Sequence, residues 1–165
     1  MKLINCLDTR LSSRYEELDP NQDGNKNTLF ADIIIDGISL YKRLIKYDMV
    51  PALGWGTNEN QRLMIDYFLL RKPHEYLYYR YLILVCPLCG DEECGFISVK
   101  IDKEEDIIIW KDFILERDNK KIDIGPFYFN WDNYSSVINN TNGTAGVSIE
   151  KPCLCWVISL SEHAS

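Results

Sequence analysis

Apolar positions in the middle of the chain have the spacing of strands. Residues 78–85 contain a continuous apolar run, and residues 96–101 alternate apolar and polar side chains. Residues 106–110 contain a second apolar run, 107–110, after an acidic turn. Alternation with a period of two is typical of a strand with one buried face, and a continuous run is typical of a strand buried on both faces. The pattern predicts three antiparallel strands that are neighbours in one sheet, because their connections are short. We expect the Trp110 ring to lie in the core of this sheet.

Further strands are expected on either side of this central group. Residues 30–35 are expected to form a strand, followed by an Asp-Gly turn in which Gly37 can adopt positive φ. Aromatic residues alternate over 127–131, and apolar residues alternate over 153–160. Both segments have the periodicity of strands.

Three short helices are predicted from capping residues. Ser39 precedes a helical pattern at 40–48 and is a good N-cap. Asn58, with a glutamine three residues later, resembles the start of a capping box. A third helix is expected to begin at Asp132 or Asn133.

These elements predict an α+β fold, a mainly antiparallel sheet with two or three covering helices. A chain of 165 residues is long enough for a single domain with a substantial core. We expect one domain over 1–165, with a polar N-terminal segment at 1–29 and a core at 30–160.

The chain carries a net charge of −7, which limits the partners it can attract. An acidic surface repels phosphate backbones, so nucleic acid is not expected and a basic protein partner fits better. Plain solubility is the alternative reason for the acidity. The apolar runs are far shorter than the roughly 20 residues that span a bilayer, and the first residues do not have the pattern of a secretory signal. We therefore expect a cytoplasmic monomer with no membrane contact.

Three closely spaced cysteines are the sharpest chemical feature. Cys86 and Cys89 form a C-x-x-C pair, and Cys94 follows within the same loop. Thiolates at this spacing can converge on one zinc ion, which is the cofactor that this pattern predicts, although a structural site needs a fourth ligand. Three free thiols are the alternative. The candidates for the fourth ligand are Cys153, Cys155, His74 and Asp91.

The same cysteine pair also resembles a redox motif, but its surroundings do not favour that interpretation. Asp91, Glu92 and Glu93 follow Cys89 directly. Negative charges raise the pKa of a neighbouring thiol, whereas a reactive thiolate needs a lowered pKa.

Other chemical motifs are absent or incomplete in the sequence. No P-loop, G-x-G-x-x-G or H-E-x-x-H pattern is present, so an enzyme is not favoured. A calcium-loop pattern begins at Asp19 but has Phe30 where the bidentate glutamate should be. Asp112 is expected to act as a cap or to pair with Arg80 rather than to act as a base.

A series of short motifs runs through the middle of the chain. They are I-D-G at 35–37, Arg80, C-x-x-C-G-D at 86–91, C-G at 94–95, W-x-D-F at 110–113 and G-P-F-x-F-x-W-x-x-Y at 125–134. Over roughly residues 30–138 this series resembles a group of small bacterial cytosolic proteins. Members of the group are often labelled oxidoreductases, and some are encoded beside toxin genes. The resemblance implies no particular catalytic residue.

The size, the acidity and the lack of a catalytic set are also similar to those of immunity proteins from contact-dependent inhibition and other polymorphic-toxin systems. Such proteins bind and block a toxic domain, often a basic nuclease. The resemblance implies a cognate toxin domain as partner, and a thiol- or zinc-dependent oxidoreductase-like protein is the alternative. Acidic side chains on two turns are the expected contacts: Asp91, Glu92 and Glu93 in the cysteine loop, and Glu104, Glu105 and Asp106 in the next turn.

Overall fold

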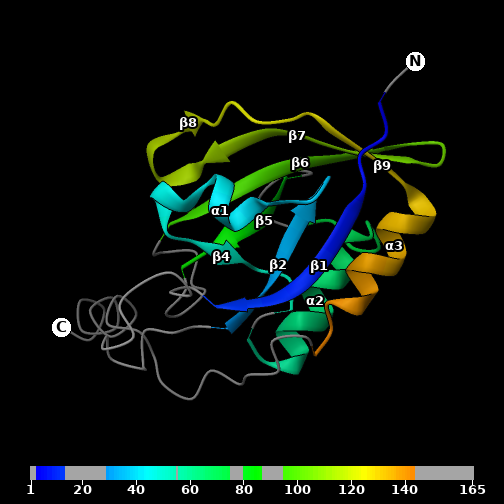
Figure 1. Cartoon of the computed structure of the whole chain (residues 1–165), viewed down its shortest axis with the longest axis horizontal. Helices are drawn as coiled ribbons and strands as arrows, with labels where there is room; N and C mark the ends of the chain where they lie inside the picture. Colours follow the sequence, from blue (N-terminus) through cyan, green and yellow to red (C-terminus); the bar gives the residue numbers. More distant parts are fainter. Residues whose placement is uncertain (1–2, 14–28, 55, 75–79, 87–94, 144–165) are drawn as a thin grey trace.

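The computed structural model describes residues 3–13, 29–54, 56–74, 80–86 and 95–143 (Figure 1). Within these residues two antiparallel sheets and three α-helices make up the fold, so the predicted α+β class is confirmed. None of the helices in the described part of the chain is long and apolar enough to cross a bilayer. The predicted strand at 153–160 lies outside the described residues.

The larger sheet contains the three central strands that the pattern predicts. β5 pairs with β6 and β6 with β7, all antiparallel, which confirms the predicted neighbours. β6 and β7 run several residues beyond their predicted ends, because polar residues on their outer faces hide the periodicity there. The sheet order is β4-β5-β6-β7-β8, and β9 also pairs with β7. The bounds are β4 Val50–Pro51, β5 Arg80–Val85, β6 Phe96–Glu104, β7 Ile107–Leu115, β8 Lys120–Lys121 and β9 Phe127–Asn130.

A bulge in β7 explains the spacing of the W-x-D-F motif. Trp110 and Phe113 are both buried, although residues three apart in a regular strand point to opposite faces. The register of β6 and β7 shifts so that Val99 alone lies opposite Asp112 and Phe113. Asp112 adopts φ +54°, a left-handed conformation that Asp tolerates better than most residues. The bulge therefore turns both aromatic rings toward the core.

The smaller sheet consists of β1 (Leu7–Ser13), β2 (Leu29–Ile35) and β3 (Ile38–Ser39) in that order. β2 is the strand predicted at 30–35, and the Asp-Gly turn after it has positive φ at both residues, 53° and 81°, as a tight hairpin requires. β1 was not predicted. Its outer side chains are mostly exposed and polar, so its sequence lacks a clear apolar alternation.

Hydrogen bonds fasten the N-terminal segment to the rest of the fold. The amide of Asn5 donates to the Tyr128 carbonyl at 2.6 Å, and the amide of Leu7 donates to the Asn133 side chain at 3.0 Å. The carboxylate of Asp36 accepts from the Cys6 amide at 2.8 Å. Residues 7–13 of the polar N-terminal segment therefore form a strand of the smaller sheet.

The helices are α1 (Leu40–Arg43), α2 (Asn58–Phe68) and α3 (Trp131–Asn140). Ser39 caps α1 as predicted, and its hydroxyl accepts from the Lys42 amide. The predicted helix at 40–48 is nevertheless too long, because α1 ends at Arg43 and the short 3-10 helix η2 (Ile45–Tyr47) follows it.

The caps of the other two helices lie earlier than predicted. Thr57, not Asn58, caps α2, and its hydroxyl accepts from the Asn60 amide. Asn130 caps α3 in place of Asp132 or Asn133. Trp131, expected in a strand, is consequently the first residue of this helix. Several polar residues in a row can each accept from a first-turn amide, so sequence alone does not select between them.

The core is centred on Trp110. Its ring packs edge-on against Phe68 of α2, Phe129 of β9 and Tyr134 of α3, with ring centroids 5.8, 5.0 and 5.9 Å away. The Tyr134 hydroxyl accepts from the Trp110 indole N–H at 3.2 Å and donates to the Phe68 carbonyl at 2.6 Å. All four side chains are buried, which confirms the expected burial of Trp110. The Tyr134 hydroxyl thus joins the large sheet to α2 and α3.

A buried carboxylate joins β2 to α1. Asp32 is 1% exposed and accepts from the Ser39 hydroxyl and from the Tyr41 amide, the latter at 3.4 Å. Arg10 lies opposite it on β1. Burial raises the pKa of Asp32, although these hydrogen bonds and Arg10 act in the other direction. Asp36, by contrast, has a lowered pKa, because the Cys6 amide and the Asn5 side chain donate to its carboxylate.

Tyr134→Phe should destabilise the protein by about 2 kcal/mol, since the Trp110 indole N–H and the Phe68 carbonyl would both lose a buried partner. The free energy of unfolding in urea measures this. Tyr47→Phe, at a half-buried tyrosine of the η2 turn, is the control and should change stability by no more than about 0.5 kcal/mol. Equal effects of the two substitutions would contradict the role of the Tyr134 hydroxyl.

Substitution of the two aspartates should give pH dependences of opposite sign. A raised folded-state pKa favours protonated Asp32 in the native state, so its contribution to stability is full below the unfolded-state pKa of about 4 and is lost as the pH rises. Asp32→Asn should therefore gain stability relative to the wild type as the pH rises from about 4 toward 7.

Asp36→Asn should gain relative stability as the pH falls through the same range, because the wild type then loses the carboxylate that its folded state favours. Asn tolerates the left-handed conformation at position 36, so the backbone is kept. Urea unfolding of the three proteins over a pH series measures both slopes. Two slopes of the same sign would contradict the assigned pKa shifts.

Candidate functional site

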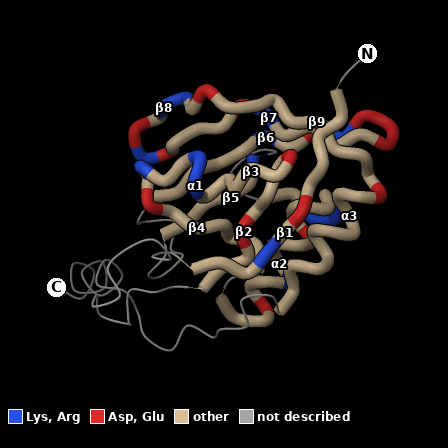
Figure 2. Tube along the Cα trace, viewed as in Figure 1, with Lys and Arg blue, Asp and Glu red and all other residues tan. Residues whose placement is uncertain are grey.

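The hairpin between β6 and β7 ends in an acidic turn. Glu104 and Ile107 are paired across the strands, so Glu105 and Asp106 form a two-residue connection. Glu104, Glu105 and Asp106 are all exposed, and Figure 2 shows this tip as an acidic loop at the edge of the molecule. The prediction that this turn is exposed is therefore confirmed, and we call these three residues the acidic tip.

The acidic tip is held against the first turn of α3. The amide of Trp131 donates to the Asp106 carbonyl at 2.7 Å. The Lys103 ammonium lies 4.2 Å from the centroid of the Trp131 ring, within the range of a cation–π contact. The Trp131 ring also packs against Tyr134, with centroids 6.2 Å apart. The tip is therefore exposed to solvent, and Trp131 links it to Tyr134 in the core.

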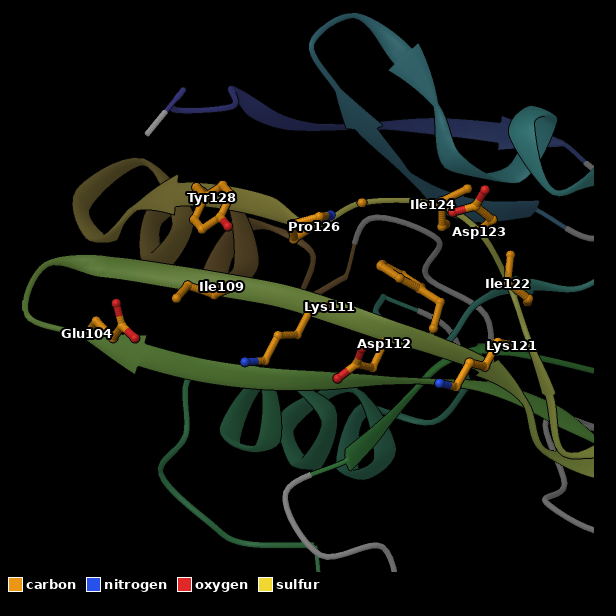
Figure 3. A pocket seen from close by; sticks show the side chains of 12 residues that line it. Glu104, Ile109, Lys111, Asp112, Lys121, Ile122, Asp123, Ile124, Pro126 and Tyr128 are labelled. Atoms are coloured by element: carbon orange, nitrogen blue, oxygen red, sulfur yellow. The ribbon is translucent and has the colours of Figure 1, made fainter. Parts of the chain in front are cut away.

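A groove of about 470 Å³ begins at the acidic tip and runs along the outer side of β7. Its second wall is the segment 121–126, which leaves β8, runs beside the bulge of β7 and joins β9 (Figure 3). Figure 3 shows Glu104 at one end and Lys121 at the other. The lining is apolar at Ile109, Phe113, Ile122, Ile124, Pro126 and Tyr128, and charged at Glu104, Lys111, Asp112, Lys121 and Asp123.

Carboxylates surround the one ammonium group near the middle of the groove. Lys111 forms an ion pair with Asp102 at 3.1 Å. The pKa of Lys111 is raised, first by Asp102 and further by Asp112 and Glu104. Three carboxylates thus act on one ammonium group.

Arg80 holds the bulge that forms part of this groove. Its guanidinium donates to the Ser98 hydroxyl at 3.0 Å and to the Asp112 carbonyl, and it lies 3.6 Å from a Glu116 oxygen. We expected Arg80 to pair with the Asp112 side chain, but it contacts the backbone of Asp112 instead. The Asp112 carboxylate stays exposed to solvent and lines the groove.

The cysteine set is mostly outside the described residues. Cys86 is half-buried directly after β5, whereas Cys89, Cys94 and the acidic residues Asp91, Glu92 and Glu93 are not described. Val85 and Phe96 are paired, so the loop that carries these residues starts and ends at neighbouring positions of the sheet. Among the described residues no group of three or more His, Cys, Asp or Glu side chains is placed to hold a metal. The zinc site remains a prediction.

Sequence reasoning found the acidic tip but not the groove. The groove depends on the path of residues 121–126 and on the bulge at Asp112, and neither has a periodic signal. The Asp within W-x-D-F and the Gly-Pro pair at 125–126 were the signs of irregular backbone that the sequence offered. They mark where the groove lies, without showing that the two segments face each other.

Comparison of the chain with protein-family models, with curated proteins and with solved structures gave no match in any of the three. A function for this chain therefore has to be inferred from its own residues.

Proposed function

We propose that this chain is an immunity-type protein that binds and neutralises a cognate toxin domain in the cytoplasm, and that the toxin domain is a basic nuclease. The acidic tip carries the proposal. Its three consecutive carboxylates stand clear of the fold on a hairpin whose backbone is fixed by Trp131. Opposite charge on a partner would speed its association with such a surface.

Two further observations support a binding role. A half-buried tryptophan lies directly behind the acidic tip, and tryptophan is enriched among residues that dominate binding energy. The chain as a whole carries a net charge of −7, which suits a partner of opposite charge. The second acidic cluster, Asp91, Glu92 and Glu93, belongs to the same proposal as an alternative contact surface, because it precedes β6 in the sequence whereas the acidic tip follows β6.

Charge reversal at the acidic tip tests the proposal. Glu104→Lys with Glu105→Lys should slow association with the toxin domain encoded beside this chain about tenfold at low salt, because steering by opposite charge is lost. The rates are measured by surface plasmon resonance at low and high salt with a catalytically inactive toxin domain. Protection of cells that express the active toxin is the functional readout.

Two matched variants complete this experiment. Asp118→Lys with Glu59→Lys reverses the same number of exposed charges away from the tip and should leave association close to that of the wild type. Glu92→Lys with Glu93→Lys examines the other acidic cluster. Salt-independent binding that none of the reversals changes would contradict the acidic interface. No binding by the wild type, together with no protection, would contradict the immunity function itself.

A thiol- or zinc-dependent oxidoreductase-like protein is the second candidate, favoured by the close approach of the two ends of the cysteine loop at Val85 and Phe96. We expect purified protein to contain one zinc ion per chain if Cys86, Cys89 and Cys94 are ligands. Elemental analysis of the wild type and of Cys89→Ser measures this, with Cys6→Ser as the control at an exposed cysteine. A zinc content well below one per chain in the wild type would remove the metal site.

A further inference from the structure

We propose that the outer edge of β1 is a docking site for residues 153–160 of this chain, which add to the smaller sheet as a fourth strand. β1 is the outermost strand of that sheet, because among the described residues only β2 pairs with it. The inference does not depend on the proposed function, since it concerns a different surface from the acidic tip.

The backbone of β1 points alternate residues toward this edge. In an antiparallel pair, residues that bond the partner strand alternate with residues whose amide and carbonyl point away from it. The Cys6 carbonyl accepts from the Asp36 amide, on the side of β2. Both backbone groups of Leu7 instead bond the Asn133 side chain of α3. The alternation therefore turns the backbone groups of Leu11 and Ser13 toward the outer edge as well.

This edge is occupied at its start and open at its end. At the start the Asn133 side chain takes the place of a neighbouring strand, and the Thr9 amide donates to the Asp8 carboxylate at 2.8 Å. Farther along, no hydrogen bond from the described part of the chain reaches the outward groups of Leu11 or Ser13. Unpaired backbone groups in a row are a template for a further strand.

Apolar surface lies beside the open end of the edge. Leu11 is 51% exposed and Leu29 is 40% exposed. Leu11 pairs with Ala31 and Leu29 pairs with Ser13, so the two leucines lie on the same face of the sheet as diagonal neighbours. A strand with one apolar face, added beside Leu11, would remove this surface from water.

The described part of the chain ends close to this edge. The Thr141 carbonyl and the Ala31 side chain both lie against Gly54, each 2.7 Å from the position that a Cβ atom would take there. Ala31 is in turn the partner of Leu11. The connection 144–152 can span up to about 30 Å when extended, so residues 153–160 can reach the edge from Gly143.

The sequence of 153–160 has the pattern that the edge requires. Its even-numbered positions are all apolar and give the strand one continuous apolar face: Leu154, Trp156, Ile158 and Leu160. Residues 14–28 also adjoin β1 in the chain, but they are mostly polar and charged and have no such alternation. The pattern therefore selects 153–160 as the occupant.

Hydrogen exchange of single amides, followed by nuclear magnetic resonance of the full-length protein, tests the proposal. The amides of Arg10 and Ser12 face β2 and serve as the internal reference, whereas those of Leu11 and Ser13 face the outer edge. We expect all four to exchange slowly in the wild type. Fast exchange at Leu11 and Ser13 would overturn the proposal, because an open edge leaves its amides to the solvent.

A double substitution identifies the segment that protects the edge. Val157→Pro with Ile158→Pro removes two consecutive amides, one of which faces β1 in any register. Exchange at Leu11 should then become about 100-fold faster, because its protection comes from local pairing, while Arg10 and Ser12 stay protected. Ser148→Pro with Ile149→Pro is the matched control in the connection and should leave Leu11 protected.

Other occupants of the edge give different results. Unchanged protection of Leu11 in the Val157→Pro, Ile158→Pro variant would mean that another segment, such as 14–28, covers the edge, and the proposal would be wrong. Protection in the wild type that appears only as the protein concentration rises would assign the edge to a second copy of the chain and would equally overturn it. Toxin binding is measured separately, so neither result bears on the immunity function.

Discussion

The hydroxyl group of Tyr134 is the contact on which the packing of this protein depends. It accepts from the Trp110 indole and donates to a carbonyl at the C-terminal end of α2, and it does both at a site closed to water. Buried polar groups destabilise a fold unless they are paired, and here one hydroxyl pairs two of them. The arrangement also fixes geometry, because it brings β7, α2 and α3 to one point.

The bulge at Asp112 connects this core to the outer surface. It turns Trp110 and Phe113 to the same inner face, and it presents the Asp112 carbonyl to Arg80 and the Asp112 carboxylate to solvent. Beyond the bulge the chain returns through 121–126 to reach β9, and the groove lies between this return and β7. The bulge at Asp112 therefore contributes both to the packing of the core and to the shape of the groove.

The proposed binding surface combines rigid support with exposed charge. The acidic tip is attached to α3 through Trp131, and α3 is attached to the core through Tyr134. A surface that is already ordered before binding loses little conformational entropy when a partner arrives. An acidic tip held in this way would meet a partner without first having to become ordered.

The sequence by itself determined the fold class, the central strands, the first hairpin turn and the burial of Trp110, because each depends on local periodicity or on a residue with a special backbone preference. It also identified the acidic tip, since consecutive charges between two apolar runs are a turn in almost any sheet. Tertiary structure decided the rest. β1 is a strand because β2 and α3 supply partners for its backbone. Asp32 is buried because Ser39 of β3 and the amide of Tyr41 of α1 meet it. The groove exists because β7 and the segment 121–126 face each other, and contacts between two separate segments leave no periodic signal in either one.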